Sequence, residues 1–101
     1  MMVKHIVFWK LKETAHGNTK AENALLIKEK LEALNGQIPG LLKLEVGIDF
    51  LHSPDSADIA LYSEFESKEA LQIYQEHPLH KAVMPFVAGA REMRISADYE
   101  V

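Results

Sequence analysis

The sequence contains no cysteine, which excludes disulfide bonds, thiolate nucleophiles and zinc–thiolate sites. This absence is compatible with a reducing compartment, and we expect a cytoplasmic protein. Long apolar runs are missing as well. The longest stretch without a charged or strongly polar residue, residues 82–90, is far shorter than the ~20 residues that a membrane-spanning helix needs. We therefore expect neither a membrane span nor a signal peptide.

The sequence also lacks any block of charge of one sign. Its 15 acidic and 11 basic residues are interspersed and leave a net charge of −4. Because nucleic-acid binding needs a concentrated basic patch, we expect no nucleic-acid partner, and a polybasic membrane anchor is missing too. Glycine-rich phosphate loops and Gly-x-Ser-x-Gly nucleophile motifs are absent, so we expect no nucleotide cofactor.

The composition is that of a small globular protein. Apolar residues make up 48% and charged residues 26% of 101 residues, which predicts one domain over residues 1–101. A domain of this size buries only roughly 60–65% of the surface that its unfolded chain exposes. Small cores of this kind often gain stability by dimerisation.

The N-terminal half predicts a strand followed by a helix. Residues 3–12 are rich in β-branched and aromatic side chains, which is typical of a strand. Both of its faces are apolar in the middle, which indicates a central strand; one carries His5, Val7, Trp9 and Leu11, the other Lys4, Ile6, Phe8 and Lys10. A capping box of Thr19 and Glu22 begins a helix over residues 19–35, which Asn35-Gly36 ends.

The C-terminal half predicts three more strands and two helical pieces separated by Pro78. The expected strands are residues 42–50, 58–65 and 90–99, and the expected helices are residues 68–76 and 79–87. The strand 42–50 alternates as an edge strand would, with its apolar side formed by Leu42, Leu44, Val46, Ile48 and Phe50. The order β-α-β-β-α-β predicts an α+β, ferredoxin-like fold with a four-stranded antiparallel sheet and helices on one face. Apolar residues remain for the uncovered face, so we expect a homodimer.

Four segments occur in an order that resembles a known family. They are residues 4–10 (Lys-His-Ile-Val-Phe-Trp-Lys), residues 38–41 (Ile-Pro-Gly-Leu), residues 65–67 (Phe-Glu-Ser) and the pattern Tyr74-x-x-His77-Pro78-x-His80. Together they resemble the stress-responsive A/B barrel (Dabb) family across residues 3–99. The resemblance implies a ferredoxin-like fold that pairs into a dimeric α+β barrel. It further implies that His5 and Trp9 face the barrel interior, whereas Ile6 and Phe8 pack against the helices.

The resemblance also suggests a site. The wider superfamily includes cofactor-free polyketide cyclases and small monooxygenases that enclose aromatic substrates, and its cyclase-type members use a histidine and a tyrosine that match His80 and Tyr74. An imidazole can remove a proton next to a carbonyl, and a phenol can hydrogen-bond the developing enolate. His80 and Tyr74 are therefore the candidate catalytic residues, and the ligand-binding candidates are His5, Val7, Trp9 and Ile59. Cyclase-type relatives have a histidine where this chain has Ile59, which predicts a drier pocket.

Two functions remain open at this point. The first is a non-catalytic homodimer whose barrel holds a small apolar or aromatic molecule. The second is a cofactor-independent enzyme, cyclase-like or monooxygenase-like, that uses His80, Tyr74 and His5. A structural alternative is that the imidazoles only satisfy backbone groups at the break before Pro78. His77 and His80 have no acidic residue at ligand spacing, so we expect no metal site.

Overall fold

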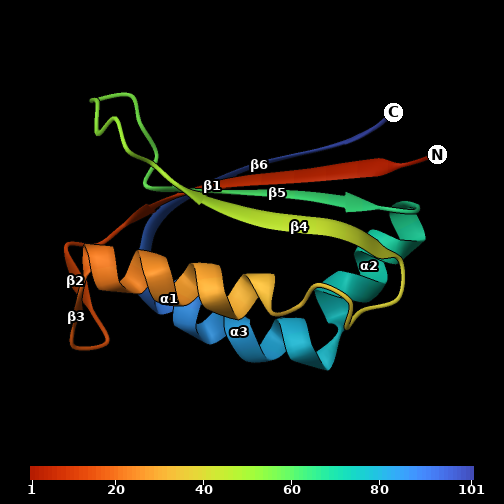
Figure 1. Ribbon diagram of the computed structural model, residues 1–101, viewed down its shortest axis with the longest axis horizontal. Helices are drawn as coiled ribbons and strands as arrows, with labels where there is room; N and C mark the ends of the chain where they lie inside the picture. Colours follow the sequence, from red (N-terminus) through yellow and green to blue (C-terminus); the bar gives the residue numbers. More distant parts are fainter.

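A four-stranded antiparallel sheet with three helices on one of its faces forms the frame of the computed structural model, which describes residues 1–101 (Figure 1). The strand order is β4-β5-β1-β6. The elements are β1 (Val3–Leu11), β2 (Thr14–Ala15), β3 (Asn18–Thr19), α1 (Lys20–Glu32), β4 (Leu41–Ile48), β5 (Ile59–Phe65), α2 (Lys68–Glu76), α3 (Pro78–Ala90) and β6 (Arg91–Glu100). The predicted α+β, ferredoxin-like fold is confirmed. No helix is long and apolar enough to cross a membrane.

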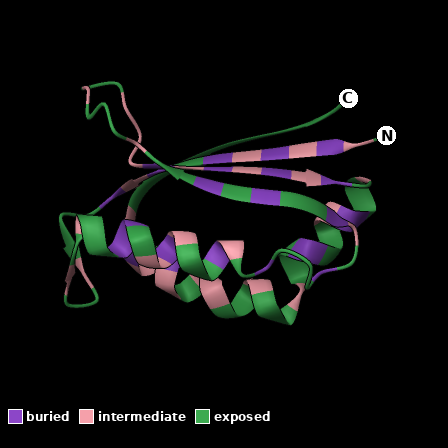
Figure 2. Ribbon diagram, viewed as in Figure 1, coloured by how far each residue is buried: buried purple, intermediate pink, exposed green.

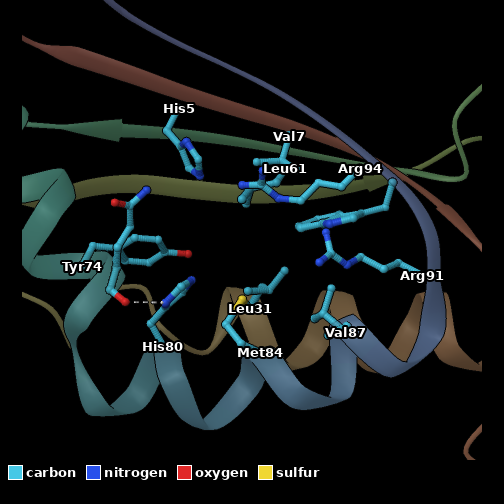
Figure 3. Close-up of a pocket in the computed structure, with 13 residues that line it drawn as sticks. His5, Val7, Leu31, Leu61, Tyr74, His80, Met84, Val87, Arg91 and Arg94 are labelled. Carbon is cyan, nitrogen blue, oxygen red and sulfur yellow. Dashed lines mark hydrogen bonds between the residues drawn. The ribbon is translucent and has the colours of Figure 1, made fainter.

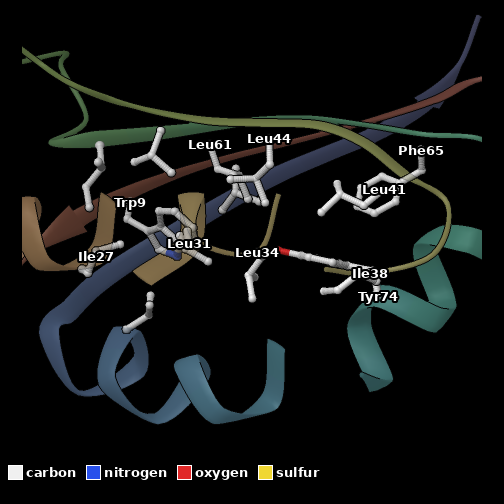
Figure 4. Close-up of a cluster of buried hydrophobic side chains, with 14 of the residues drawn as sticks. Trp9, Ile27, Leu31, Leu34, Ile38, Leu41, Leu44, Leu61, Phe65 and Tyr74 are labelled. Atoms are coloured by element: carbon white, nitrogen blue, oxygen red, sulfur yellow. The ribbon is translucent and has the colours of Figure 1, made fainter. Parts of the chain in front are cut away.

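Strand β1 lies between β5 and β6, as its two apolar faces predict, but the predicted assignment of those faces is wrong. His5 and Trp9 are 4% and 3% exposed and belong to the face that the helices cover. Phe8 points to the opposite side and is 43% exposed. The period of two separates the two sets of residues, but it does not say which set the helices cover. Ile27 and Leu31 of α1 belong to the same buried cluster as Trp9 (Figure 4).

Helix α1 begins at the predicted capping box and ends earlier than expected. The Thr19 hydroxyl accepts a hydrogen bond from the backbone N–H of Glu22, and the Glu22 carboxylate accepts one from the N–H of Thr19. The helix ends at Glu32, so Asn35 is outside it. The Asn35 side chain instead pairs with both backbone polar groups of Leu44, at 2.8 and 3.0 Å, and so ties the end of the helix segment to β4.

Strand β4 is an edge strand, as predicted, but its apolar side begins one residue earlier. Its pairing with β5 shifts register between Leu41 and Lys43, and an irregularity of this kind changes which side chain points inward. Leu41 is therefore 9% exposed and Leu42 50% exposed. Phe50, expected on the same side, lies beyond the end of the strand and is also exposed.

Pro78 separates α2 from α3, as predicted. The side chain of His77 caps α3 by accepting a hydrogen bond from the backbone N–H of Leu79 at 3.1 Å. Helix α3 continues through Pro85 and Gly89 to Ala90 and is thus longer than the sequence indicated. The buried residues of the sheet and helices form one cluster between the two layers, whereas β6 is exposed along almost its whole length (Figure 2).

One element was not expected. The polar connection after β1 folds into a small hairpin, β2–β3, whose turn residues His16 and Gly17 have φ angles of 55° and 76°. The imidazole Nε2 of His16 lies 2.9 Å from the carbonyl oxygen of Phe86, and the two rings are 4.3 Å apart. This contact holds the hairpin against α3.

Candidate ligand-binding site

A partly open cavity of about 280 Å³ lies between the sheet and helices α2 and α3 (Figure 3). Its apolar wall comes from the sheet and from helices α1 and α3 and consists of Val7, Trp9, Leu31, Leu61, Met84, Val87 and Ala88. Its polar groups are His5, Tyr74, Gln75, His80, Arg91 and Arg94. The cavity lies on the helix side of the sheet. The predicted site is lined by the face of β1 that carries His5 and Trp9, and only the expectation that this face points away from the helices is wrong.

Tyr74 reaches the cavity from the end of α2 and is almost fully buried. Its hydroxyl group has no hydrogen-bond partner, and it is the one buried side-chain polar atom of the chain in that condition. Burial disfavours the charged phenolate and raises the pKa of Tyr74 well above its usual value, so the phenol keeps its proton. A protonated phenol without a partner can donate a hydrogen bond to a bound molecule.

His80 lies on the first turns of α3 with its ring centroid 4.3 Å from that of Tyr74. Its Nδ1 lies 3.2 Å from the carbonyl oxygen of Gln75; because a carbonyl only accepts, Nδ1 carries the proton and Nε2 has a free lone pair. Burial lowers the pKa of His80 below its usual value, and the nearby His5 and Arg94 lower it further. His80 is therefore a neutral imidazole at neutral pH.

His5 enters the cavity from the sheet. Its Nδ1 donates a hydrogen bond to the carboxylate of Asp98 on the neighbouring strand β6. The His5 ring is 6.4 Å from the Tyr74 ring, so one donor and two imidazoles from three different elements face a common space (Figure 3). Imidazole and phenol groups around one space can hold a polar group of a ligand or move a proton.

The sequence candidates are therefore brought together with one exception. His5, Val7, Trp9, Tyr74 and His80 all line the cavity. Ile59 is fully buried elsewhere in the core and does not line it. No group of three or more histidine, aspartate or glutamate side chains is arranged to hold a metal ion.

Sequence reasoning missed Arg91, Arg94 and Asp98. The sequence favours an interpretation of Arg91 and Arg94 as charges on solvated strand faces, with Asp98 on the polar face of the same strand, and β6 is exposed along almost its whole length. For the two arginines, the amino-acid composition of the chain contains a signal that could have found them. Arg91 and Arg94 are the only arginines of the chain and are three residues apart.

Comparisons with known proteins agree with this fold. A family model described as the stress responsive A/B barrel domain matches residues 3–101. An uncharacterized protein from Streptomyces coelicolor is 35% identical over 102 residues, which cover 98% of this chain and 99% of that protein.

Solved structures give the same picture. A dimeric protein of unknown function with a ferredoxin-like fold, from Bacteroides fragilis, is 38% identical with a TM-score of 0.85, covering 99% of this chain and 96% of that one. A Dabb family protein with a ferredoxin-like fold, from Mesorhizobium loti, is 24% identical with a TM-score of 0.73, covering 99% and 96% of the two chains.

Proposed function

The chain belongs to the stress-responsive A/B barrel family, and we propose that it is a cytoplasmic homodimer whose subunits each bind a small apolar or aromatic molecule. The observation that carries this proposal is the cavity of about 280 Å³ between the sheet and the helices. Cavities of about this size and mixed lining, mostly apolar with a few convergent polar groups, are typical of small-molecule sites. The absence of cysteine is in keeping with a reducing compartment.

The polar end of the cavity supports a bound ligand rather than a purely structural role. A buried hydroxyl group without a partner costs about 1–3 kcal/mol, and the Tyr74 hydroxyl is such a group. A carbonyl or hydroxyl group of a ligand would remove that cost by accepting its hydrogen bond. The ligand would therefore have one polar atom near Tyr74 and an apolar body against Trp9 and Leu61.

The homodimer is supported by the face of the sheet that no helix covers. Phe8 and Ile95 are directly paired across β1 and β6 on this face and are 43% and 57% exposed. Met93 and Tyr99 extend the same surface along β6 and are also exposed. A second copy of the chain, packed sheet against sheet, would bury these side chains. The similar protein from Bacteroides fragilis is dimeric, which supports a second copy of the chain as the partner that covers this face.

A second candidate function is cofactor-independent catalysis of the cyclase or monooxygenase type. The close approach of Tyr74 and His80, with His5 opposite, favours it. The neutral His80 could accept a proton through Nε2 from a carbon next to a carbonyl, and Tyr74 could donate a hydrogen bond to the resulting enolate. This role predicts that His80→Ala abolishes proton transfer and leaves the dimer intact. An unfolded His80→Ala protein would instead identify His80 as a structural residue.

The binding proposal can be tested with the protein's single tryptophan. Trp9 lines the cavity, so its fluorescence reports on occupancy. We expect a neutral aromatic probe, 3-phenylpropanamide, to change Trp9 emission in a saturable way. Ala88 also lines the cavity, so Ala88→Leu should narrow the cavity and weaken binding of the probe without adding a second tryptophan. Leu25→Ala, a change on the outer side of α1, is the matched control and should bind normally. A probe that leaves Trp9 emission unchanged at millimolar concentration would contradict the proposal.

A further inference from the structure

The two arginines of the chain both line the cavity. The sequence has 11 basic residues, of which only Arg91 and Arg94 are arginines, and no lysine lines the cavity. No aspartate or glutamate lines it either. The cavity of a protein with a net charge of −4 thus has a lining whose only permanent charges are positive.

Neither arginine has an anionic partner within the chain. The ion pairs of the structure involve lysines and histidines, and no carboxylate lies within ion-pair distance of either guanidinium group. Arg94 donates one long hydrogen bond, of 3.3 Å, to the hydroxyl of Ser96, and Arg91 makes no side-chain hydrogen bond. A guanidinium group has five N–H donors, so most donors of this pair have no partner within the chain and are open to a ligand or to solvent.

The position of the pair relative to the other polar groups is also informative. Both side chains extend from β6 over the apolar wall of the cavity (Figure 3). Arg91 lies at the end opposite Tyr74 and His80, and the guanidinium group of Arg94 reaches from that side towards the middle of the cavity. The cavity therefore has two polar ends of different character. One has neutral hydrogen-bonding groups, and two unpaired cations extend from the other.

We propose that the ligand of this cavity is an anion: a small molecule with an apolar or aromatic body and a carboxylate group that Arg91 and Arg94 bind. This inference rests on the proposed binding function and adds the chemical class of the ligand. Guanidinium groups match carboxylates in geometry and bind them through two parallel N–H···O bonds. The apolar body would lie against Trp9 and Val87, between the two polar ends.

The test compares two probes that differ in charge and have nearly the same shape, 3-phenylpropanoate and 3-phenylpropanamide. Binding to the whole chain of residues 1–101 is measured by Trp9 fluorescence and by calorimetry. A charge-assisted hydrogen bond typically favours a ligand by about tenfold or more in affinity. We therefore expect the carboxylate to bind at least tenfold more tightly than the amide, and this preference to shrink as the salt concentration rises.

Variants identify the residues responsible. Arg91→Gln and Arg94→Gln should each reduce the affinity for the carboxylate several-fold and leave the affinity for the amide unchanged. Lys81→Gln on α3 removes the same charge from a residue that does not line the cavity, and it should preserve the carboxylate preference. A preference that survives in the double variant Arg91→Gln/Arg94→Gln would overturn the assignment to these residues.

The remaining outcomes separate this inference from the proposed function. Equal affinity for the two probes in the wild-type protein would overturn the inference and leave the binding function standing. Absence of binding for both probes would contradict the proposed function, and the inference with it.

Discussion

His5 on β1 and Asp98 on β6 occupy directly opposed positions in the sheet, and the carboxylate of Asp98 accepts a hydrogen bond from the imidazole Nδ1 of His5. Because a carboxylate only accepts hydrogen bonds, this contact places a proton on Nδ1 of His5. The same contact aligns a ring that faces Tyr74 across the cavity. Strand β6 thus contributes to the site although its residues are exposed.

Removing either partner of this pair should lower stability. His5 is 4% exposed, so Asp98→Ala leaves a buried ring nitrogen without its acceptor, at a cost of about 1–3 kcal/mol in the free energy of unfolding. A double-mutant cycle with His5→Ala and Asp98→Ala, measured by urea unfolding, should give a coupling free energy of about 1 kcal/mol or more. Additive effects of the two substitutions would contradict a direct interaction.

Tyr74→Phe should separate binding from stability. The variant removes a hydroxyl group that has no partner, so the free energy of unfolding of the ligand-free protein should stay constant or rise by about 1 kcal/mol. The affinity for 3-phenylpropanamide should fall, because the side chain at position 74 can no longer donate a hydrogen bond to the carbonyl group of the probe. Urea unfolding and fluorescence titration measure the two quantities. A large loss of stability in Tyr74→Phe would mean that the hydroxyl has a structural partner.

Several parts of this fold follow from local patterns, and others depend on contacts that no local pattern contains. The capping box at Thr19 and the break at Pro78 were predictable because the residues that determine them are adjacent in the sequence. The approach of Tyr74 and His80 was expected from family resemblance. The face of β1 that meets the helices was predicted wrongly, because that choice depends on the apolar residues of helices distant in the sequence. The role of Asp98 depends on strand register and was not predictable from its own segment.

The register shift in β4 predicts that substitution of Leu41 lowers stability more than substitution of Leu42, whereas regular alternation along the strand predicts the reverse. Leu41 is buried and Leu42 is half exposed, so Leu41→Ala should cost about 2–5 kcal/mol, the usual loss for a buried leucine. Leu42→Ala should cost about 0.5 kcal/mol or less in the monomeric unit. Chemical denaturation of the two variants makes the comparison. If Leu42→Ala lowered the free energy of unfolding more than Leu41→Ala, Leu42 would point inward, as the regular alternation predicts.

The uncovered face of the sheet should determine the oligomeric state. Ile95→Asp introduces a charge next to Phe8 on that face, and burying it against a second copy would cost several kcal/mol. Sedimentation equilibrium should give about twice 11.4 kDa for the wild type and a single chain mass for Ile95→Asp. Leu25→Asp is the matched control, because Leu25 is equally exposed but lies on α1, and it should remain dimeric. A dimeric Ile95→Asp protein would place the interface elsewhere.

The neutral state of His80 should make stability depend on pH in one direction. Burial lowers the pKa of His80 in the folded protein below its usual value of 6.5, which the unfolded chain retains. As the pH falls below about 6.5, the unfolded state takes up a proton that the folded state does not bind, and the free energy of unfolding therefore falls. Below the lowered pKa both states bind the proton, so the loss stops there. His80→Gln lacks this titration. The difference in free energy of unfolding, wild type minus His80→Gln, should thus be constant above pH 7. It should decrease as the pH is lowered, because only the wild type loses stability through this titration. Urea unfolding of both proteins from pH 4 to pH 8 measures it, and a difference that does not vary with pH would mean that His80 is not held neutral by its surroundings.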